Sequence, residues 1–221
     1  MATHSNGMSA RQLWRQLGLG SSKRAWLPAA KLRRAMVDPN RSRLSRLLEG
    51  DETAIAFRSN DDPPAGGQGR GHDGRMLVAG AVEIVGNGPA RVRLTPIDDG
   101  SAPSLRAVIK ANIADGATVT TDGWSGYPGA PGLTHEPHVV GTRAAHIVLP
   151  WVYRAFCNLK TWAVDVYEGL RREHLKAYLD EFVFRFIRRT SPHATFRTIL
   201  SLGMVLKPAS YKMLIAAEAR G

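Results

Sequence analysis

The segment from residue 76 to residue 96 restricts the fold of this chain more than any other. Met76–Val85 is an apolar run rich in β-branched side chains, and Ala90–Pro96 alternates apolar residues with arginine. Gly86-Asn87-Gly88 lies between the two runs, and glycine and asparagine tolerate the positive φ angles of tight hairpin turns. This pattern predicts two antiparallel strands joined by a short turn.

The flanking residues extend the hairpin into a mixed α/β pattern. Residues 47–57 form a strand-like run broken by polar residues, Ser101–Ala111 has helical spacing, and Ala117–Thr121 is another short strand. Residues 151–189 are typical of a helical region, with an apolar stripe made by Leu175, Leu179, Phe182 and Phe186. We therefore predict an α/β fold in which helices flank a mixed sheet.

The N-terminal part is basic and helical in pattern. The chain has a net charge of +11, and residues 1–50 contain ten basic residues and only two acidic ones. Residues 9–19 and 24–37 predict two short helices around a Gly-containing turn, which indicates either a helix-turn-helix or a hairpin that only packs. Pro28 argues against a regular second helix unless it lies in the first turn. A basic end favours a polyanionic partner, and the predicted DNA contacts are Arg11, Arg15, Lys23, Arg24, Lys31, Arg33 and Arg34.

Other features exclude several classes of protein. Cys157 is the single cysteine, so an internal disulfide framework and a cysteine-based zinc site are excluded. No apolar run approaches the roughly 18 residues of a membrane span, and no signal-peptide core begins the chain. We expect a cytoplasmic, nucleoid-associated protein with no membrane partner.

Two aspartates stand where a metal site for phosphate chemistry would need them. Asp51 lies in the strand-like run at 47–57, and Asp122 directly follows the strand that ends at Thr121. Carboxylates on strands project from a rigid frame, and Mg²⁺ prefers such oxygen ligands. Taken alone, an aspartate before glycine is more often a turn former. His135 and His138 could form a metal pair, but their surroundings favour the entry to a strand.

Several motifs, in order, resemble the ISXO2-like (IS1595-group) transposase family. The late helix ends Phe-Arg-Phe-Ile-Arg-Arg at residues 184–189, where the family usually has Phe-Arg-Phe-Asn-Arg-Arg. The other matching segments are Ser9–Leu19, Gly50-Asp51-Glu52-Thr53, Thr121–Tyr127, Ala145–Pro150 and Asn158–Trp162. The resemblance runs from about residue 7 to residue 215.

This resemblance implies an RNase H-like core and divalent-metal-dependent cleavage and joining of DNA strands at transposon ends. The resemblance implies that Asp51 and Asp122 bind the metal, with Mg²⁺ or Mn²⁺ as cofactor. It also implies that Lys160 contacts the DNA end. The implied partners are double-stranded DNA, from transposon ends and target, and further copies of the chain assembled on it. Trp124 and Tyr127 are expected to pack beside Asp122 or against DNA.

The chain also departs from the family pattern. Tyr153 stands where the family has Glu, Asn or His as third ligand, which leaves Asn158 as a substitute at the catalytic site. Gly50 replaces a β-branched residue and is expected to loosen the strand that carries Asp51. The family's N-terminal zinc ribbon is missing, so we expect a truncated N-terminus. These departures predict impaired activity.

The sequence thus predicts a DDE-type transposase, with a catalytically inactive DNA-binding remnant as the alternative. A housekeeping RNase H-like nuclease is a third hypothesis, which the order of the motifs disfavours. The predicted domains are a basic helix-turn-helix-like segment at 1–46, a catalytic domain at 47–190 that includes a loop at 58–75, and a C-terminal tail at 191–221.

Overall fold

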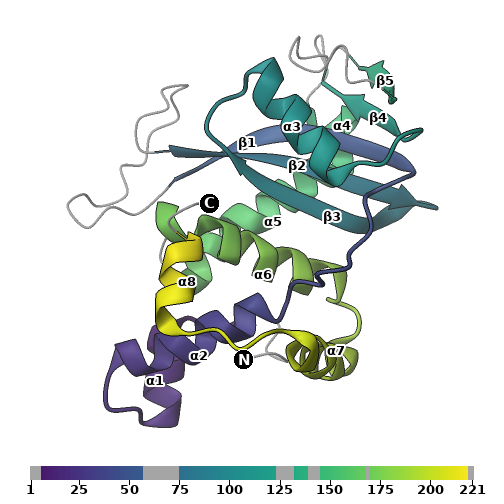
Figure 1. Ribbon diagram of the computed structural model, residues 1–221. Helices are drawn as coiled ribbons and strands as arrows, with labels where there is room; N and C mark the ends of the chain where they lie inside the picture. The colour runs from purple at the N-terminus through teal and green to yellow at the C-terminus, as the bar shows by residue number, and fades with distance from the viewer. Residues whose placement is uncertain (1–5, 57–74, 123–131, 139–144, 168–169, 219–221) are drawn as a thin grey trace. The chain divides into compact units, whose positions relative to one another are not determined.

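The structure, a computed structural model, describes residues 6–56, 75–122, 132–138, 145–167 and 170–218. The chain divides into two compact units (Figure 1). One, the helical unit, comprises Met1–Arg41 with Trp162–Gly221, and the other, the sheet unit, comprises Ser42–Thr161. The domain boundaries predicted after residues 46 and 190 stay predictions.

A mixed sheet is the framework of the sheet unit. Its strands are β1 (Leu47–Ala56), β2 (Arg75–Val85), β3 (Gly88–Ile97), β4 (Thr118–Thr121) and β5 (Thr134–Pro137). Among the described residues they form one sheet in the order β3-β2-β1-β4-β5. The β1–β2 and β2–β3 pairs are antiparallel, whereas β1–β4 and β4–β5 are parallel. With its flanking helices, this sheet confirms the predicted α/β fold with a mixed sheet.

The predicted hairpin is confirmed as β2 and β3. Gly86 has a φ of 59°, a left-handed conformation that favours glycine, and Val85 pairs with Gly88 directly across the turn. β1 agrees with the strand-like run predicted at 47–57, and it is continuous despite its polar residues because it pairs with β2 along its whole length. Gly50 lies within this continuous strand, opposite Ala81.

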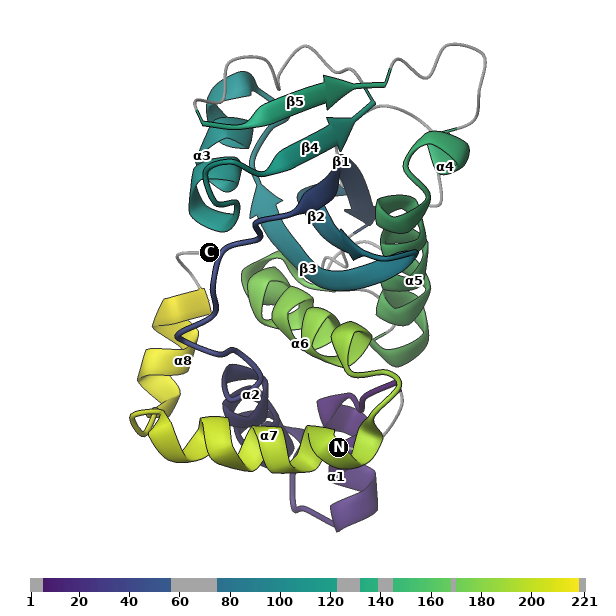
Figure 2. The same cartoon turned by 90° about the vertical axis from the view of Figure 1, so that its right-hand side faces the viewer.

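The two faces of the sheet carry different helices. α3 (Ala102–Asn112) covers one face and α5 (Pro150–Tyr167) covers the other with its sheet-unit part (Figures 1 and 2). The α3 face carries one apolar core cluster of this unit, in which Leu48 and Val119 of the sheet pack with Leu105 and Ile109. Since side chains alternate along a strand, the odd-numbered residues of β1 face α5.

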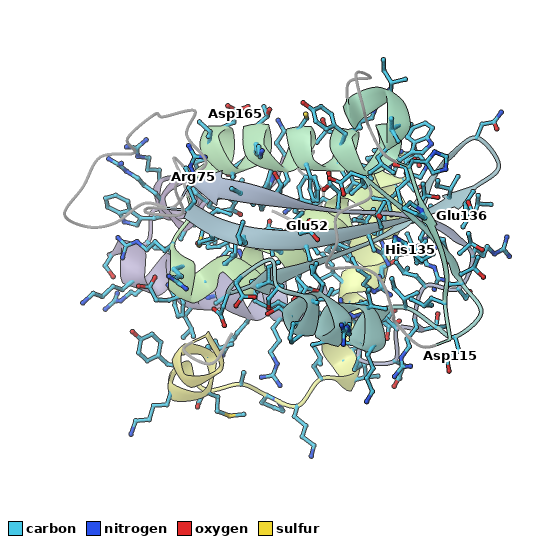
Figure 3. All side chains as sticks on the ribbon, turned by 90° about the horizontal axis from the view of Figure 1, so that it is seen from above. Glu52, Arg75, Asp115, His135, Glu136 and Asp165 are labelled. Carbon is cyan, nitrogen blue, oxygen red and sulfur yellow. The ribbon has the colours of Figure 1, made fainter. Side chains whose placement is uncertain are left out.

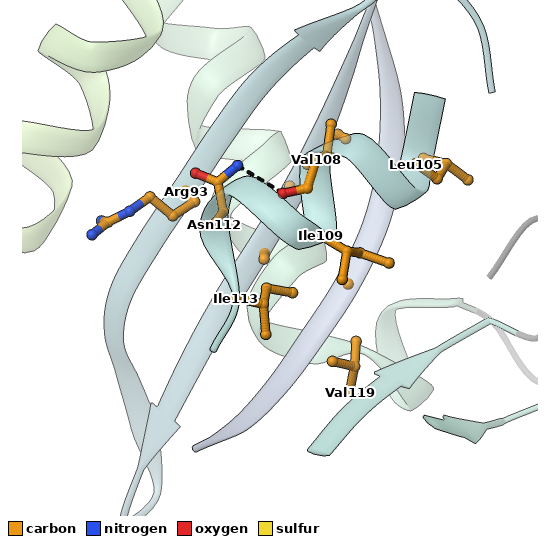
Figure 4. Close-up of a pocket in the computed structure, with 11 residues that line it drawn as sticks. Arg93, Leu105, Val108, Ile109, Asn112, Ile113 and Val119 are labelled. Carbon is orange, nitrogen blue, oxygen red and sulfur yellow. Dashed lines mark hydrogen bonds between the residues drawn. The ribbon is translucent and has the colours of Figure 1, made fainter. Parts of the chain in front are cut away.

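A small apolar hollow lies under α3 (Figure 4). Leu105, Ile109, Ile113 and Val119 line it together with glycine and alanine residues of β1 and β2. Asn112 donates a hydrogen bond to the Val108 carbonyl at 2.9 Å and so keeps its amide on the helix. The lining carries no carboxylate, so the hollow is a packing feature of the core.

The helical unit contains α1 (Ala10–Leu17), α2 (Ser22–Arg34), the 3₁₀ turn η1 (Arg172–His174), α6 (Leu175–Ile187), α7 (Pro192–Val205) and α8 (Tyr211–Glu218). The helical region predicted at 151–189 is therefore α5 and α6 with η1 between them, a division that the apolar pattern alone did not reveal. The predicted apolar stripe is confirmed, since Leu175, Leu179, Phe182 and Phe186 are all buried.

The prediction for Pro28 was wrong. α2 runs through Pro28, seven residues into the helix, although proline has no N–H to donate to the preceding turn. Tertiary burial outweighs this local defect: the neighbouring Ala25 and Ala29 are fully buried, whereas Pro28 itself is exposed. No helix in the described part of the chain is long and apolar enough to cross a membrane.

Candidate active site

The parallel pairing of β1 and β4 brings the two predicted aspartates onto neighbouring strands. Leu48 pairs with Val119 and Glu49 with Thr120. Extending this register by two residues sets Asp51 opposite Asp122, on the same face of the sheet. That face is the one covered by α5. Asp51 and Asp122 are 71 positions apart in the 221-residue sequence, but this register places them on neighbouring strands and on the same face of the sheet.

The charges around Asp51 show that the two aspartates interact. Asp51 is partly buried, and its Oδ1 accepts a hydrogen bond from the Glu52 N–H at 2.8 Å. Burial raises the pKa of Asp51 to about 6, the Glu52 hydrogen bond opposes this shift, and the negative charge of Asp122 adds to it. The positive charge of Lys160, on α5, lowers the same pKa. Asp51, Asp122 and Lys160 thus form one electrostatic cluster.

Tyr153 and Asn158 were the two alternatives for the third metal ligand. They lie on different sides of α5. Tyr153 is seven residues before Lys160, which places the two within about 20° of each other around the helix. Asn158 is two residues before Lys160 and lies about 200° away from it. Both side chains are exposed, Tyr153 at 41%. Helix geometry therefore places Tyr153, and not Asn158, on the Lys160 side of α5.

Two residues that hold α5 on the sheet, Glu49 and Gly80, did not stand out in the sequence. Glu49 is buried on β1, and its Oε2 accepts hydrogen bonds from the N–H groups of Trp151 and Val152 at 2.7 and 2.8 Å. Gly80 pairs with Asp51, and a Cβ on Gly80 would lie 2.6 Å from the Phe156 ring. The available signal was the position of Glu49, two residues before Asp51 and hence on the same face.

The acids present fit a hard divalent cation in part. Asp51 and Asp122 offer carboxylate oxygens, and the raised pKa of Asp51 reflects burial and a like charge that a cation would offset. Among the described residues, however, no three His, Cys, Asp or Glu side chains gather into a metal-binding group. The described part of the chain therefore supplies two of the ligands that the sequence predicted.

His135 is part of the sheet, as its surroundings indicated. It lies in β5 (Figure 3), and its Nε2 is 2.8 Å from the Thr121 hydroxyl. The Thr121 side chain is buried, and the His138 N–H donates a hydrogen bond to the Thr121 carbonyl. These contacts hold the end of β4, directly before Asp122. Trp124 and Tyr127 lie outside the described residues.

The predicted basic DNA contacts divide into exposed and buried residues. Arg11, Arg15, Lys23, Arg24 and Lys31 are exposed on α1 and α2, and Arg34 is half-buried. Arg33 is only 3% exposed, and its Nε donates to Glu181 at 2.7 Å. The prediction that Arg33 contacts DNA was therefore wrong, because sequence spacing does not reveal a buried partner 148 residues away.

The turn between α1 and α2 is well formed. Ser9 caps α1 by accepting a hydrogen bond from the Gln12 N–H, and Gln12 accepts one from the Ser9 N–H in return. Gly18 ends α1 with a φ of 59°. Ser21 then caps α2 by accepting from the Arg24 N–H. The predicted pair of helices is thus confirmed.

Comparison with protein families decides the relationship of this chain to known proteins. The ISXO2-like transposase domain matches residues 43–186, which include both aspartates and Lys160. The chain belongs to this family. The match covers the whole described sheet, α5 and all of α6 except its last residue, Ile187.

Comparisons with individual proteins add little to this assignment of an ISXO2-like transposase domain. No curated protein matches the sequence. A pre-cleavage Mos1 transpososome is 14% identical, over 91% of this chain and 76% of the other, with a TM-score of 0.40. A Mos1 transposase paired-end complex with left transposon end is 16% identical and a Mos1 mariner paired-end complex with Mn is 12% identical, both at the same coverage and a TM-score of 0.39. Likenesses this weak carry no further argument.

Proposed function

We propose that this ISXO2-like transposase domain cuts and rejoins DNA strands at the ends of its own mobile element. The observation that carries the proposal is the cluster of Asp51, Asp122 and Lys160 at the parallel β1–β4 pair, in which burial and then the like charge of Asp122 raise the pKa of Asp51. Asp51 and Asp122 would hold Mg²⁺ or Mn²⁺ between them. The cation would supply activation of an attacking oxygen and stabilisation of a leaving one.

The chain's own residues would then bind and orient the DNA. The Lys160 ammonium group is positive and exposed next to Asp51, so it is suited to contact a phosphate at the cleaved end. The exposed cations of α1 and α2 would contact the backbone of the duplex, and further copies of the chain would assemble on it. Asp51 must lose its proton to bind a cation, so cleavage should weaken below about pH 6.

The test of this proposal is cleavage of element-end DNA with Mn²⁺ or Mg²⁺. Wild type should cut, whereas Asp51→Asn and Asp122→Ala should lose at least about 100-fold in rate, because either change removes a ligand of the cation. Asp115→Ala is the matched control, since Asp115 is an exposed acid in the turn before β4. Equal loss in the control, or undiminished cutting by Asp122→Ala, would refute the assignment.

A second candidate function is DNA binding without cleavage. It is favoured by Tyr153, because a neutral phenol is a poor ligand for Mg²⁺, and by the two-carboxylate cluster of the described residues. If wild type and Tyr153→His both bind element ends and neither cuts, the binding function is correct. If Tyr153→His cuts and wild type does not, this copy is an impaired enzyme.

The binding itself has an electrostatic signature. The affinity for duplex DNA should fall steeply with salt, and replacing Arg11 and Arg15 with glutamine should reduce the salt slope by roughly one for each phosphate that the variant no longer binds. Lys110→Gln is the control, since it removes an exposed cation from α3. A flat salt response of the wild type would exclude phosphate binding by α1 and α2.

A further inference from the structure

We propose that Glu49 is a positioning residue that fixes where α5 begins on β1 and thereby holds Lys160 at Asp51. The inference rests on the proposed function for the role of Lys160, but the anchoring of α5 can be measured without it. Glu49 was not among the residues that the sequence singled out. Its assignment comes from the contacts of its buried carboxylate.

The first step is the hydrogen bonding at the start of α5. The first N–H groups of a helix have no partner within the helix. Pro150 opens α5 and has no N–H, so Trp151 and Val152 present the first such donors. Glu49 Oε2 accepts both, at 2.7 and 2.8 Å, and its negative charge also suits the positive end of the helix dipole. Glu49 therefore caps α5 from a strand about a hundred residues earlier in the chain.

The second step concerns the burial of Glu49, whose carboxylate is directed at the start of α5 and away from solvent. Its side chain is only 5% exposed, and its Oε2 is the atom shared by both helix donors. A buried carboxylate without donors would be strongly unfavourable, so the strand and the helix end depend on each other. Glu49 and Asp51 lie on the same face of β1, which makes this strand the common reference for the helix and for the catalytic carboxylate.

The third step connects the anchor to Lys160. A helix is rigid over this distance, and nine residues from Trp151 to Lys160 span about 13.5 Å. Phe156 gives a second fixed point, because its ring packs against Gly80, the residue that pairs with Asp51. With both points fixed, α5 has one axial position on the sheet, and Lys160 reaches the electrostatic environment of Asp51.

Glu83 provides a matched control for the burial of a glutamate in the same sheet. It is 3% exposed, and it accepts hydrogen bonds from Arg91 of the neighbouring strand and from the Ser45 N–H. These contacts tie the β2–β3 hairpin to the segment before β1. Glu83→Ala should therefore weaken the sheet without releasing the start of α5.

The experiment compares Glu49→Ala, Glu49→Gln, Glu49→Asp and Glu83→Ala by site-resolved amide hydrogen exchange of the full chain. Glu49→Ala should speed exchange at Trp151 and Val152 by about tenfold or more, since their charge-assisted hydrogen bonds are removed. Glu49→Gln keeps an acceptor oxygen and should stay near wild type. Glu49→Asp, which is shorter by one methylene, should behave like Glu49→Ala and replaces it if that variant does not fold. Glu83→Ala should leave both amides protected.

A second readout follows Lys160 directly. The rate of chemical labelling of its ammonium group should change in Glu49→Ala and recover in Glu49→Gln, with exposed Lys110 as the internal reference. In cleavage assays, Glu49→Ala should lower kcat more than it raises KM, because Lys160 is displaced from the reacting end. Unchanged exchange at Trp151 and Val152 would overturn the anchor, and unchanged Lys160 labelling would overturn the positioning role. If both respond and the wild type does not cut DNA, only the proposed function fails.

Discussion

Two buried acidic residues, one in each unit, differ in how far neighbouring positive charges compensate their carboxylates. Glu181 of α6 in the helical unit has no exposed side-chain surface, and Arg33 and Arg185 both form ion pairs with it, each at 2.7 Å. Tyr167 also donates its hydroxyl to Glu181, at 2.8 Å. The charge is compensated, and its partners come from α2, α5 and α6. This cluster ties together distant segments of the helical unit.

Asp51 of the sheet unit has a different environment. It accepts a hydrogen bond from its neighbouring backbone N–H and lies near the negative charge of Asp122, with the exposed Lys160 as the opposing charge. Its raised pKa shows that burial and repulsion outweigh the compensation. A protein keeps a balanced buried charge for structure, whereas an unbalanced one marks a site that a cation or a proton can complete. The comparison separates a structural acid, Glu181, from the acid that we propose to bind a cation, Asp51.

The largest expected effect is at Glu181. Glu181→Gln removes the negative charge that pairs with the buried Arg33 and Arg185, which should reduce the free energy of unfolding by about 3–5 kcal/mol. Denaturant unfolding measures this. Asp180→Asn is the matched control, because Asp180 forms its ion pairs with the more exposed Arg41 and Lys176, and such pairs are worth about 0–1 kcal/mol. A small effect at Glu181 would break the contrast between the two acids.

The next largest effect is at Asp51, where a substitution should increase the free energy of unfolding instead of reducing it. The folded pKa of Asp51 is about 6 and its usual value is 3.8, so ionisation of Asp51 works against folding. The stability that this group contributes is fully present below about pH 4 and is lost as the pH rises through about 6. Asp51→Asn should therefore increase the unfolding free energy by up to about 3 kcal/mol at pH 7.5 and leave it nearly unchanged at pH 4. Destabilisation by Asp51→Asn at pH 7.5 would contradict the picture of an under-compensated charge.

The smallest effects come from the neighbours of Asp51 and should differ in direction. Asp122→Asn removes a like charge and should lower the pKa of Asp51, whereas Lys160→Gln removes an opposing charge and should raise it. Each shift should be under about one unit, because burial is the larger cause. An NMR titration of the Asp51 carboxyl carbon measures both. Shifts in the same direction would show that the three residues do not form one cluster.

The sequence predicted the secondary structure better than the contacts. The β2–β3 hairpin was visible because turn chemistry and period-two alternation are local properties. The helix through Pro28 was not predicted correctly, since burial against distant segments overrode the local pattern. The helical region at 151–189 was predicted, but its division into α5, η1 and α6 was not. Asp51 and Asp122 were first noted as carboxylates on strands, whereas Lys160 was predicted only through the family motifs. Each of them taken alone was an ordinary strand-end or helix residue.

The sequence by itself determined the alternation of strands and helices, the basic N-terminal segment and the family motifs, because each depends on residues close together in the chain. Only the tertiary structure decided which charges meet. It paired Arg33 with Glu181, removing a predicted DNA contact, and it attached Glu49 to the first N–H groups of α5. Partners more than a hundred residues apart produce no periodic pattern in the sequence, because burial and charge compensation are decided only when the chain folds.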